Sequence, residues 1–192
     1  MKKKISLIMV SIVLAVSLAG CGIVTVVPIG EEAPFTGKEA FDSGAQSSDD
    51  WSAVVEDIKG KAADVSEVLA NGADGTAVSG SAKIVEFNTE TPKHYLVVEV
   101  EGYSGGEVRI QAGGVYSGTA IRDAQSVKAF EDFANQTEWS QYAKALNQEA
   151  DTQVVAPLSI DESVAGKTVT FTGAAAEGGG AVTITPVEMT IE

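Results

Sequence analysis

The chain has 192 residues, with 13 basic and 27 acidic side chains and a formal net charge of −14 at pH 7. A hydrophobic content of 44% is enough to bury a core, which excludes a disordered chain, and the length favours one domain with a small appendage. The negative charge repels nucleic acid and anionic lipid headgroups, which argues against nucleic acid as a partner.

The first 20 residues have the three parts of an export signal. Lys2, Lys3 and Lys4 precede an uncharged apolar stretch over residues 5–20, which ends in Leu-Ala-Gly before Cys21. The stretch is shorter than the roughly 20 residues of a membrane-spanning helix. Its end resembles the bacterial lipobox, which implies cleavage before Cys21, transfer of a diacylglyceryl group to the sulfur and acylation of the new amino terminus. The alternative is an ordinary secretory signal in which Cys21 is incidental.

Lipid on Cys21 has consequences for the rest of the chain, because this is the only cysteine. The exported domain then has neither a disulfide nor a thiolate metal site, and no cofactor is expected other than the covalent lipid. Two or three acyl chains anchor a protein stably, so the membrane is a predicted partner and the predicted location is the extracytoplasmic face of a bacterial membrane, in the periplasm or at the cell surface. Removal of residues 1–20 leaves 10 basic and 27 acidic residues.

Residues 21–50 are rich in Gly, Pro, Ser and acidic side chains, as in a linker. The run Ile-Val-Thr-Val-Val-Pro-Ile at residues 23–29 is too apolar for a solvated spacer. We expect it to dock on the domain as an extended segment, because a strand containing proline is acceptable at a sheet edge; resting near the bilayer is the alternative.

Residues 51–77 are predicted to form a helical part. Apolar residues recur at helical spacing and the pattern closes at Asn71-Gly72, with a kink possible at Gly60. The apolar stripe comprises Trp51, Val54, Val55, Ile58, Ala62, Val65, Val68 and Leu69.

Residues 78–192 change to alternating patterns typical of strands. The predicted strands are residues 82–87, 95–100, 108–111 with 115–121, 168–172 and 181–191. Two sets of apolar residues out of phase, in residues 127–134 and 139–146, predict two short helices that meet near residues 135–137. Three strands, helices and two strands predict an α+β fold with an OB-like five-stranded barrel, although other small Greek-key barrels give a similar order.

Several motifs resemble the family called domain of unknown function 2291, described as predicted periplasmic lipoproteins. They are GGVYSGTAIRDA at residues 113–124, FEDFANQTEWSQYAKALN at 130–147, GKTVTFTG at 166–173 and VTITPV at 182–187. The resemblance implies a small helical part with a barrel of the OB type. It also implies an accessory role, because family members are often encoded beside sugar-uptake ABC transporters of the ribose class.

The candidate site residues lie between the end of the third predicted strand and the point where the two helices meet: Thr119, Arg122, Asp123, Asn135 and Gln136. Neighbours in an extended segment point to opposite sides, so Arg122 and Asp123 are expected to find separate partners. We expect Arg122 to pin the corner and Asp123 to cap the following helix; a polar ligand site is the alternative. Asn135 with Glu138 makes a capping pair, or else Asn135 is a ligand residue.

The sequence contains no recognisable catalytic constellation, so we predict that the protein is not an enzyme. His94 is the only histidine, a metal site needs several convergent ligands, and no serine lies in a nucleophile elbow. The leading prediction is a lipid-anchored, non-enzymatic accessory or binding module of a sugar-type ABC uptake system, with transporter components as partners. A direct sugar-binding protein is the first alternative, and an envelope hydrolase is the second.

Overall fold

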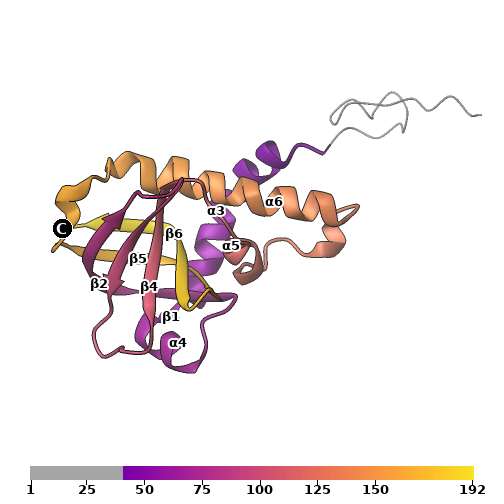
Figure 1. Cartoon of the computed structure of the whole chain (residues 1–192). Helices are drawn as coiled ribbons and strands as arrows, with labels where there is room; N and C mark the ends of the chain where they lie inside the picture. The colour runs from indigo at the N-terminus through magenta and orange to yellow at the C-terminus, as the bar shows by residue number, and fades with distance from the viewer. Residues whose placement is uncertain (1–40) are drawn as a thin grey trace, which may run out of the picture. The chain divides into compact units, whose positions relative to one another are not determined.

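The computed structural model describes residues 41–192 (Figure 1). Cys21 and the apolar run at residues 23–29 lie outside the described residues. The helices are α3 (Ser43–Lys61), α4 (Val65–Asn71), α5 (Ala120–Ala124), α6 (Gln136–Glu149), the π-helix η2 (Ala150–Val155) and the 3-10 turns η1 (Phe130–Asp132), η3 (Ala156–Leu158) and η4 (Glu162–Val164). The strands are β1 (Ala63–Asp64), β2 (Thr76–Asn88), β3 (Lys93–Glu99), β4 (Glu107–Gly114), β5 (Thr168–Gly178) and β6 (Ala181–Ile191).

Five of the strands close into a barrel (Figure 1). β2 pairs antiparallel with β3, and β3 pairs antiparallel with β4. β4 runs parallel to β6, β6 pairs with β5, and β5 returns to β2. This strand order, with α6 inserted between the third and fourth strands of the barrel, is that of the OB fold. The predicted fold class is therefore confirmed.

The core contains apolar side chains of both the barrel and the helices. Leu96, Ile110 and Phe171 are fully buried on barrel strands. Tyr142 and Leu146 are fully buried on α6, which packs against α3. The barrel and the helices therefore form one described unit, residues 42–192.

The first helix begins at Ser43, within the predicted linker of residues 21–50, rather than at Trp51. Asp42 is its N-cap, and Oδ1 of Asp42 accepts hydrogen bonds from the backbone amides of Gly44 and Ala45, both at 3.0 Å. The first turns of α3 carry no apolar stripe, so periodicity could not find them. The helix also ends at Lys61, directly after Gly60, instead of continuing through a kink.

β2 is much longer than the predicted strand at residues 82–87, and its start at Thr76 moves the beginning of the barrel from the predicted residue 78. Its first half pairs with β5 and its second half with β3. The first half is made of small residues, and a Cβ atom on Gly80 would lie only 2.6 Å from Cγ1 of Val65. Small side chains are needed for this close approach, and they hide the alternation that predicts strands.

The third barrel strand ends earlier than predicted. β4 stops at Gly114, whereas residues 115–121 were expected to extend it. Gly113 and Gly114 have φ angles of +110° and +69°, values that strand residues with side chains rarely adopt. The chain therefore turns away from the sheet at this point and enters α5.

Only one of the two predicted helices after α5 forms. Residues 127–134 contain a single 3-10 turn, η1, whereas α6 covers and extends the second predicted helix. The buried side chain of Gln125 explains the difference. It donates to the carbonyls of Arg122 and Lys128 at 3.0 and 2.8 Å and accepts from the amide of Lys128 at 2.8 Å, which replaces helical backbone bonds.

Candidate functional site at the junction of barrel and helices

The candidate site lies where two parallel strands of the barrel, β4 and β6, move apart. β4 and β6 separate after Ile110 and Ile184, the last pair of their shared register. Gln111 and Thr185 follow directly, and both side chains are buried. Nε2 of Gln111 donates a hydrogen bond to Oγ1 of Thr185 over 2.6 Å. A bond between side chains thus continues the contact between the strands beyond their backbone ladder.

The same side chains hold the loop of residues 115–119, which we call the junction loop. The amide of Ser117 donates to Oε1 of Gln111 at 2.9 Å, and Nε2 of Gln111 donates to the carbonyl of Ser117 at 3.2 Å. From α6, Nδ2 of the buried Asn147 donates to the carbonyl of Gly118 at 3.0 Å. The exposed loop is therefore held by polar side chains of two elements, Gln111 of β4 and Asn147 of α6.

Two buried side-chain oxygen atoms among residues 41–192 have no hydrogen-bond partner, and both belong to this junction. They are Oη of Tyr116 and Oδ1 of Asn147. Burial raises the pKa of Tyr116, and the negative charge of Asp151 raises it further, so the phenol stays protonated at neutral pH. Because buried polar atoms are nearly always paired, these two atoms mark the junction as the candidate functional site.

Three titratable side chains surround Gly113 next to the junction loop. A Cβ atom on Gly113 would lie 3.9 Å from Oδ1 of Asp151 and 4.0 Å from Nδ1 of His94. The hydroxyl of Tyr116 is directed toward Asp151 and the amide of Gly113, although no hydrogen bond of ordinary geometry forms. His94 is partly buried and packs edge-on against Phe87, with ring centroids 6.1 Å apart.

Sequence reasoning missed Tyr116 and Asp151 as site residues. The motif at residues 113–124 already contained Tyr116, so it was an available signal. Asp151 lies in η2, where the π-helical turn brings its carboxylate toward Gly113. No pattern of apolar residues predicts such a turn, because it adds one residue to an ordinary helix.

Arg122 and Asp123 lie in α5 and pair with each other, so the expectation of separate partners in an extended segment is wrong. Nε and Nη2 of Arg122 donate to Oδ1 of Asp123 at 2.8 and 2.6 Å. Oδ2 of Asp123 accepts from Oγ1 of Thr119 at 2.5 Å. Asp123 therefore links its own neighbours and caps no following helix. The cause is the helical turn, which places Asp123 four residues after Thr119 on the same face, while the long side chain of Arg122 reaches the neighbouring carboxylate.

Arg122 also connects α5 to α6. Its guanidinium lies 4.8 Å from the ring centroid of Trp139, and its side chain is only 14% exposed. Trp139 belongs to a group of four rings in mutual contact, which we call the aromatic cluster: Phe130, Phe133, Trp139 and Tyr142. The contacts of Arg122 are thus those of a corner residue.

The aromatic cluster is buried on one side and exposed on the other. The hydroxyl of Tyr142 donates to Oδ2 of Asp50 at 3.1 Å, and burial together with the Asp50 carboxylate raises the pKa of Tyr142. On the outer side, Phe130 is 41% exposed and packs edge-on against Trp139. The cluster therefore presents one apolar ring to solvent from a fixed position.

Asn135 and Gln136 lie at the start of α6. Oδ1 of Asn135 accepts from the amides of Thr137 and Glu138 at 2.9 and 3.0 Å, which confirms the predicted cap. Glu138 completes the capping pair by accepting from the amide of Ala134 and from Nδ2 of Asn135. Gln136 is exposed, and within residues 41–192 it makes no hydrogen bond to the Arg122 network. The structure thus separates these two residues from Arg122.

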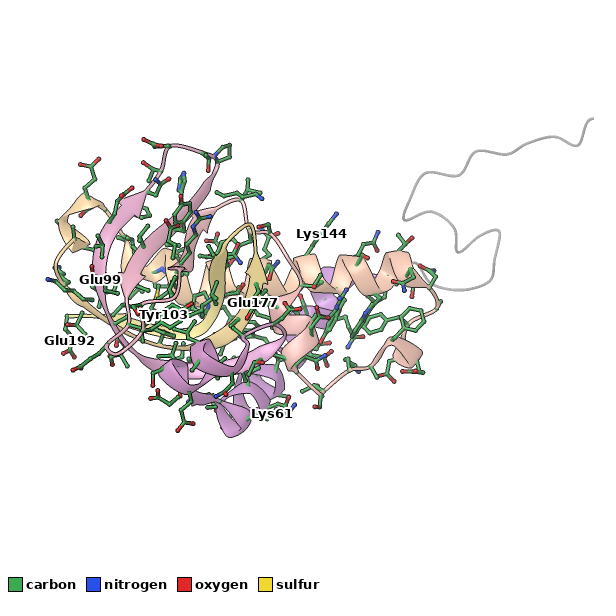
Figure 2. The ribbon with its side chains drawn as sticks, turned by 60° about the horizontal axis from the view of Figure 1, so that its bottom comes forward. Lys61, Glu99, Tyr103, Lys144, Glu177 and Glu192 are labelled. Carbon is green, nitrogen blue, oxygen red and sulfur yellow. The ribbon has the colours of Figure 1, made fainter. Side chains whose placement is uncertain are left out.

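Two open hollows on the surface of residues 41–192 contain none of the predicted site residues. The first, of about 250 Å³, lies between α3 and α6 and includes Ser47 and Lys144. The second, of about 540 Å³, lies on the barrel and includes Lys83, Glu99 and Tyr103. Figure 2 shows Glu99 and Tyr103 on the barrel and Lys144 on the helical side. Both hollows are wide open to solvent.

The two loops that bind ligands in many OB folds join the first strand of the barrel to the second and the fourth to the fifth, here residues 89–92 and 179–180, and they do not converge. The loop after β2 lies beside the end of β4, because the amide of Val115 donates to the carbonyl of Pro92 at 2.7 Å. The turn before β6 lies beside the start of β4, where Glu107 pairs with Ala181. A ligand bound across both loops would have to span the whole of β4.

Two further properties concern the described part of the chain. Within residues 41–192, no three His, Cys, Asp or Glu side chains are grouped to hold a metal ion. No helix in this range is both long enough and apolar enough to cross a membrane.

Comparison of the sequence with models of known protein families identifies the family of this chain. A family model described as "Predicted periplasmic lipoprotein (DUF2291)" matches residues 11–190, which is nearly the whole sequence. The chain belongs to this family. The DUF2291 membership confirms the resemblance seen in the sequence motifs and the extracytoplasmic, lipid-anchored location. Cys21 as the lipidated residue stays a prediction, since it lies outside the described residues.

One solved structure supports the fold of this DUF2291 protein. An OB-fold protein from Thermotoga maritima, solved by crystallography, superposes with a TM-score of 0.60 at 17% sequence identity. The match covers 80% of this chain and 100% of the Thermotoga chain. No curated protein matches the sequence. At this identity the likeness concerns the fold alone.

Proposed function

We propose that this protein is a non-enzymatic accessory module of an extracytoplasmic solute-uptake system, such as a sugar ABC transporter, and that it binds another protein of that system. The family resemblance, with its implied link to sugar transporters, supports the biological setting. The filled barrel supports binding at the surface, because side chains such as Leu96 and Ile110 occupy its interior. The proposal therefore needs a surface suited to a protein partner.

The observation that carries the proposal is the exposed Phe130 on the aromatic cluster. An isolated exposed phenylalanine is unremarkable, but Phe130 is held against Trp139, which is itself held by Arg122. A rigid aromatic side chain loses little conformational entropy on binding, and such anchors carry much of the energy of protein interfaces.

Charge around Phe130 indicates the chemistry of the partner. The neighbouring Glu131 and Asp132 are exposed on the same turn, and the mature chain carries 27 acidic residues against 10 basic ones. A complementary partner has an apolar pocket for the ring and lysine or arginine side chains at its rim, and charge of this kind accelerates association. The expected partners are the solute-binding protein or the permease of the transporter.

The test uses the purified mature protein and the solute-binding protein or permease from the neighbouring genes. Phe130→Ser is expected to weaken binding by about tenfold or more, as for an interface anchor. Val85→Ser is the matched control, because Val85 is 46% exposed on the barrel, close to the 41% of Phe130. Absence of binding to every transporter component, or equal weakening by both variants, would refute the proposal.

The lipid anchor has a separate test. Cys21→Ser removes the proposed acceptor of the diacylglyceryl group, so this variant should appear in the soluble extracytoplasmic fraction. Metabolic labelling with a radioactive fatty acid should also be lost. A variant that still fractionates entirely with membranes would show that Cys21 is not the anchor.

Direct binding of a small solute, such as a sugar, is a second candidate function. It is favoured by the unpaired hydroxyl of Tyr116 next to Asp151. A ligand at 100 times its dissociation constant stabilises a folded protein by roughly 2.7 kcal/mol, which a thermal-shift panel of monosaccharides detects. A panel without any shift would remove this second function and leave the accessory function untouched.

A further inference from the structure

The larger of the two hollows, of about 540 Å³, lies where β2 passes from one neighbouring strand to another, and we call it the barrel hollow. β2 pairs with β5 as far as Lys83, and from Lys83 onward it pairs with β3, whose last residue is Glu99. On the side of β2 that faces β3, the ladder with β1 ends at Ser79. The barrel hollow therefore coincides with a gap between two ladders, and its volume is typical of a small-molecule site.

The backbone of Ser81 directs a hydrogen-bond donor and an acceptor into this gap. Successive residues of an antiparallel strand turn their N–H and C=O groups to opposite sides. Ile84 turns its groups toward β5, because its amide donates to the carbonyl of Lys167 at 2.9 Å. Ser81, three residues earlier, therefore turns its groups to the other side, between the ladders that β2 forms with β1 and with β3. Neither of those strands pairs with Ser81, which is exposed.

Three charged side chains line the barrel hollow: Lys83, Glu99 and Glu101. Lys83 and Glu99 lie directly opposite each other across β2 and β3, but within residues 41–192 they form no ion pair with each other or with any other residue. Glu101 follows in the turn after β3 and is likewise without an ion pair in this range. All three side chains are exposed, so a ligand from solution reaches them without rearrangement of the fold.

Apolar surface from Tyr103 and from two buried side chains, Ala82 and Val100, completes the lining. Tyr103 is half-buried, and Figure 2 shows it near Glu99 on the barrel. A Cβ atom on Gly105 would lie 2.8 Å from Oη of Tyr103 and 2.9 Å from two of its ring carbons. Glycine at this position therefore lets the ring lie close against its own loop. The barrel hollow thus combines an apolar surface with a few charged groups, as small-molecule sites do.

We propose that the barrel hollow binds a free basic α-amino acid, such as arginine or lysine. This ligand has one anionic and two cationic groups, which complement the ammonium group and two carboxylates of the hollow. Its carboxylate pairs with Lys83 and the amide of Ser81, and its α-ammonium group pairs with Glu99 and the carbonyl of Ser81. Its side-chain cation reaches Glu101, and the chain that carries this cation lies on the ring of Tyr103.

The placement of the charges favours an α-amino acid over a ligand with distant charges. Residues directly opposite in an antiparallel ladder have Cα atoms about 5 Å apart, so Lys83 and Glu99 can hold a carboxylate and an ammonium group that share one carbon atom. The inference goes beyond the functions proposed above, because it uses neither Phe130 nor Tyr116.

The experiment is calorimetric titration of the mature protein, in a non-ionic detergent, with L-arginine, L-lysine, L-leucine and L-glutamate. Arginine or lysine is expected to bind about tenfold or more tightly than leucine, and glutamate should bind most weakly. Lys83→Met and Glu99→Gln should each weaken the binding of the basic amino acid about tenfold, because each removes a charge-assisted hydrogen bond. Lys93→Met and Glu90→Gln are the matched controls, since they make the same chemical changes at exposed positions outside the barrel hollow.

A second titration separates the site from general attraction of cations, because the mature chain has 27 acidic residues and 10 basic ones. If general attraction were the cause, Lys83→Met would make the surface more negative and strengthen the binding of arginine. The proposed contact predicts weaker binding instead. Agmatine, which is arginine without its carboxylate, should bind Lys83→Met no more weakly than it binds the wild type.

The remaining outcomes are equally decisive. Failure of both arginine and lysine to bind overturns the proposal, as does binding that Lys83→Met and Glu99→Gln leave unchanged. Tighter binding of leucine or glutamate than of the basic amino acids overturns the proposed ligand class. The variants change exposed side chains and should keep the wild-type melting temperature, so a loss of binding by a folded variant supports the contact.

Discussion

The hydrogen bond between Gln111 and Thr185 is predicted to stabilise the opening between β4 and β6, and a double-mutant cycle measures its contribution. Gln111→Met keeps the length of the side chain and removes its polar atoms. Thr185→Val replaces the hydroxyl by a methyl group of similar shape. Both residues are buried, at 6% and 1% exposure, so neither lost hydrogen bond is replaced freely by water.

The expected magnitudes follow from the partners that each change leaves behind. Gln111→Met removes one bond to Thr185 and two to the backbone of Ser117. Ser117 is exposed and its backbone can bind water, but Oγ1 of Thr185 stays buried and unpaired, so we expect a loss of about 2–3 kcal/mol in the free energy of unfolding. Thr185→Val removes one bond and should cost about 1 kcal/mol.

The double variant carries the diagnostic information. Once Gln111 is methionine, Thr185→Val removes an unpaired hydroxyl, so the second change should cost nothing or even stabilise. The predicted coupling is about 1 kcal/mol or more, measured by urea unfolding of the four proteins. Additivity within about 0.5 kcal/mol would show that the two side chains act independently and that the junction is not a network.

Three further predictions concern the helices. Arg122→Ala should lower the melting temperature and shift the fluorescence of Trp139 to longer wavelength, whereas normal melting with loss of partner or solute binding would indicate a ligand role. Asn135→Ala removes the cap of α6 and should cost about 1 kcal/mol in urea unfolding; an unchanged midpoint would contradict the capping role. Burial raises the pKa of Asp57, but hydrogen bonds from Lys61 and a backbone amide outweigh it and hold the pKa below its ordinary value. A carboxylate whose pKa is lower in the folded than in the unfolded state stabilises the fold above the unfolded pKa, and this contribution is lost as the pH falls through the folded pKa. Asp57→Asn should therefore be less stable than wild type at about pH 7 and equal to it at about pH 2. A difference that persists in acid would exclude this cause.

The elements that could be predicted from the sequence are those with regular apolar patterns. β6 and α6 alternate or repeat at the expected period; β6 was found with its observed bounds, and the apolar set of residues 139–146 lies inside α6. The first halves of β2 and α3 were missed because they consist mostly of alanine, glycine, serine and aspartate. In β2, the close approach of Val65 to Gly80 requires a small residue, and small side chains carry no periodic signal.

The candidate site was predictable only in part. The motif at residues 113–124 contains the junction loop. The cap formed by Asn135 could be derived from residue type and spacing. The pairing of Arg122 with Asp123 depends on a five-residue helix that has no pattern of its own. The position of Asp151 depends on a π-helical turn. Both contacts therefore depend on local backbone geometry, which the periodicity of apolar residues does not predict.

α6 and η2 form a continuous helical segment that contributes to both the partner-binding region and the solute-binding region beside Asp151. Trp139 lies near its first turn and supports Phe130, and Asp151 lies in its last part beside Gly113. At a rise of 1.5 Å per residue, the twelve residues between Trp139 and Asp151 span about 18 Å, which is too far for one monosaccharide to reach both. A solute held beside Asp151 and a protein on Phe130 can therefore be bound at the same time. Sugar binding and an accessory role are then compatible functions of one domain, and any effect of the solute on partner affinity must equal the effect of the partner on solute affinity.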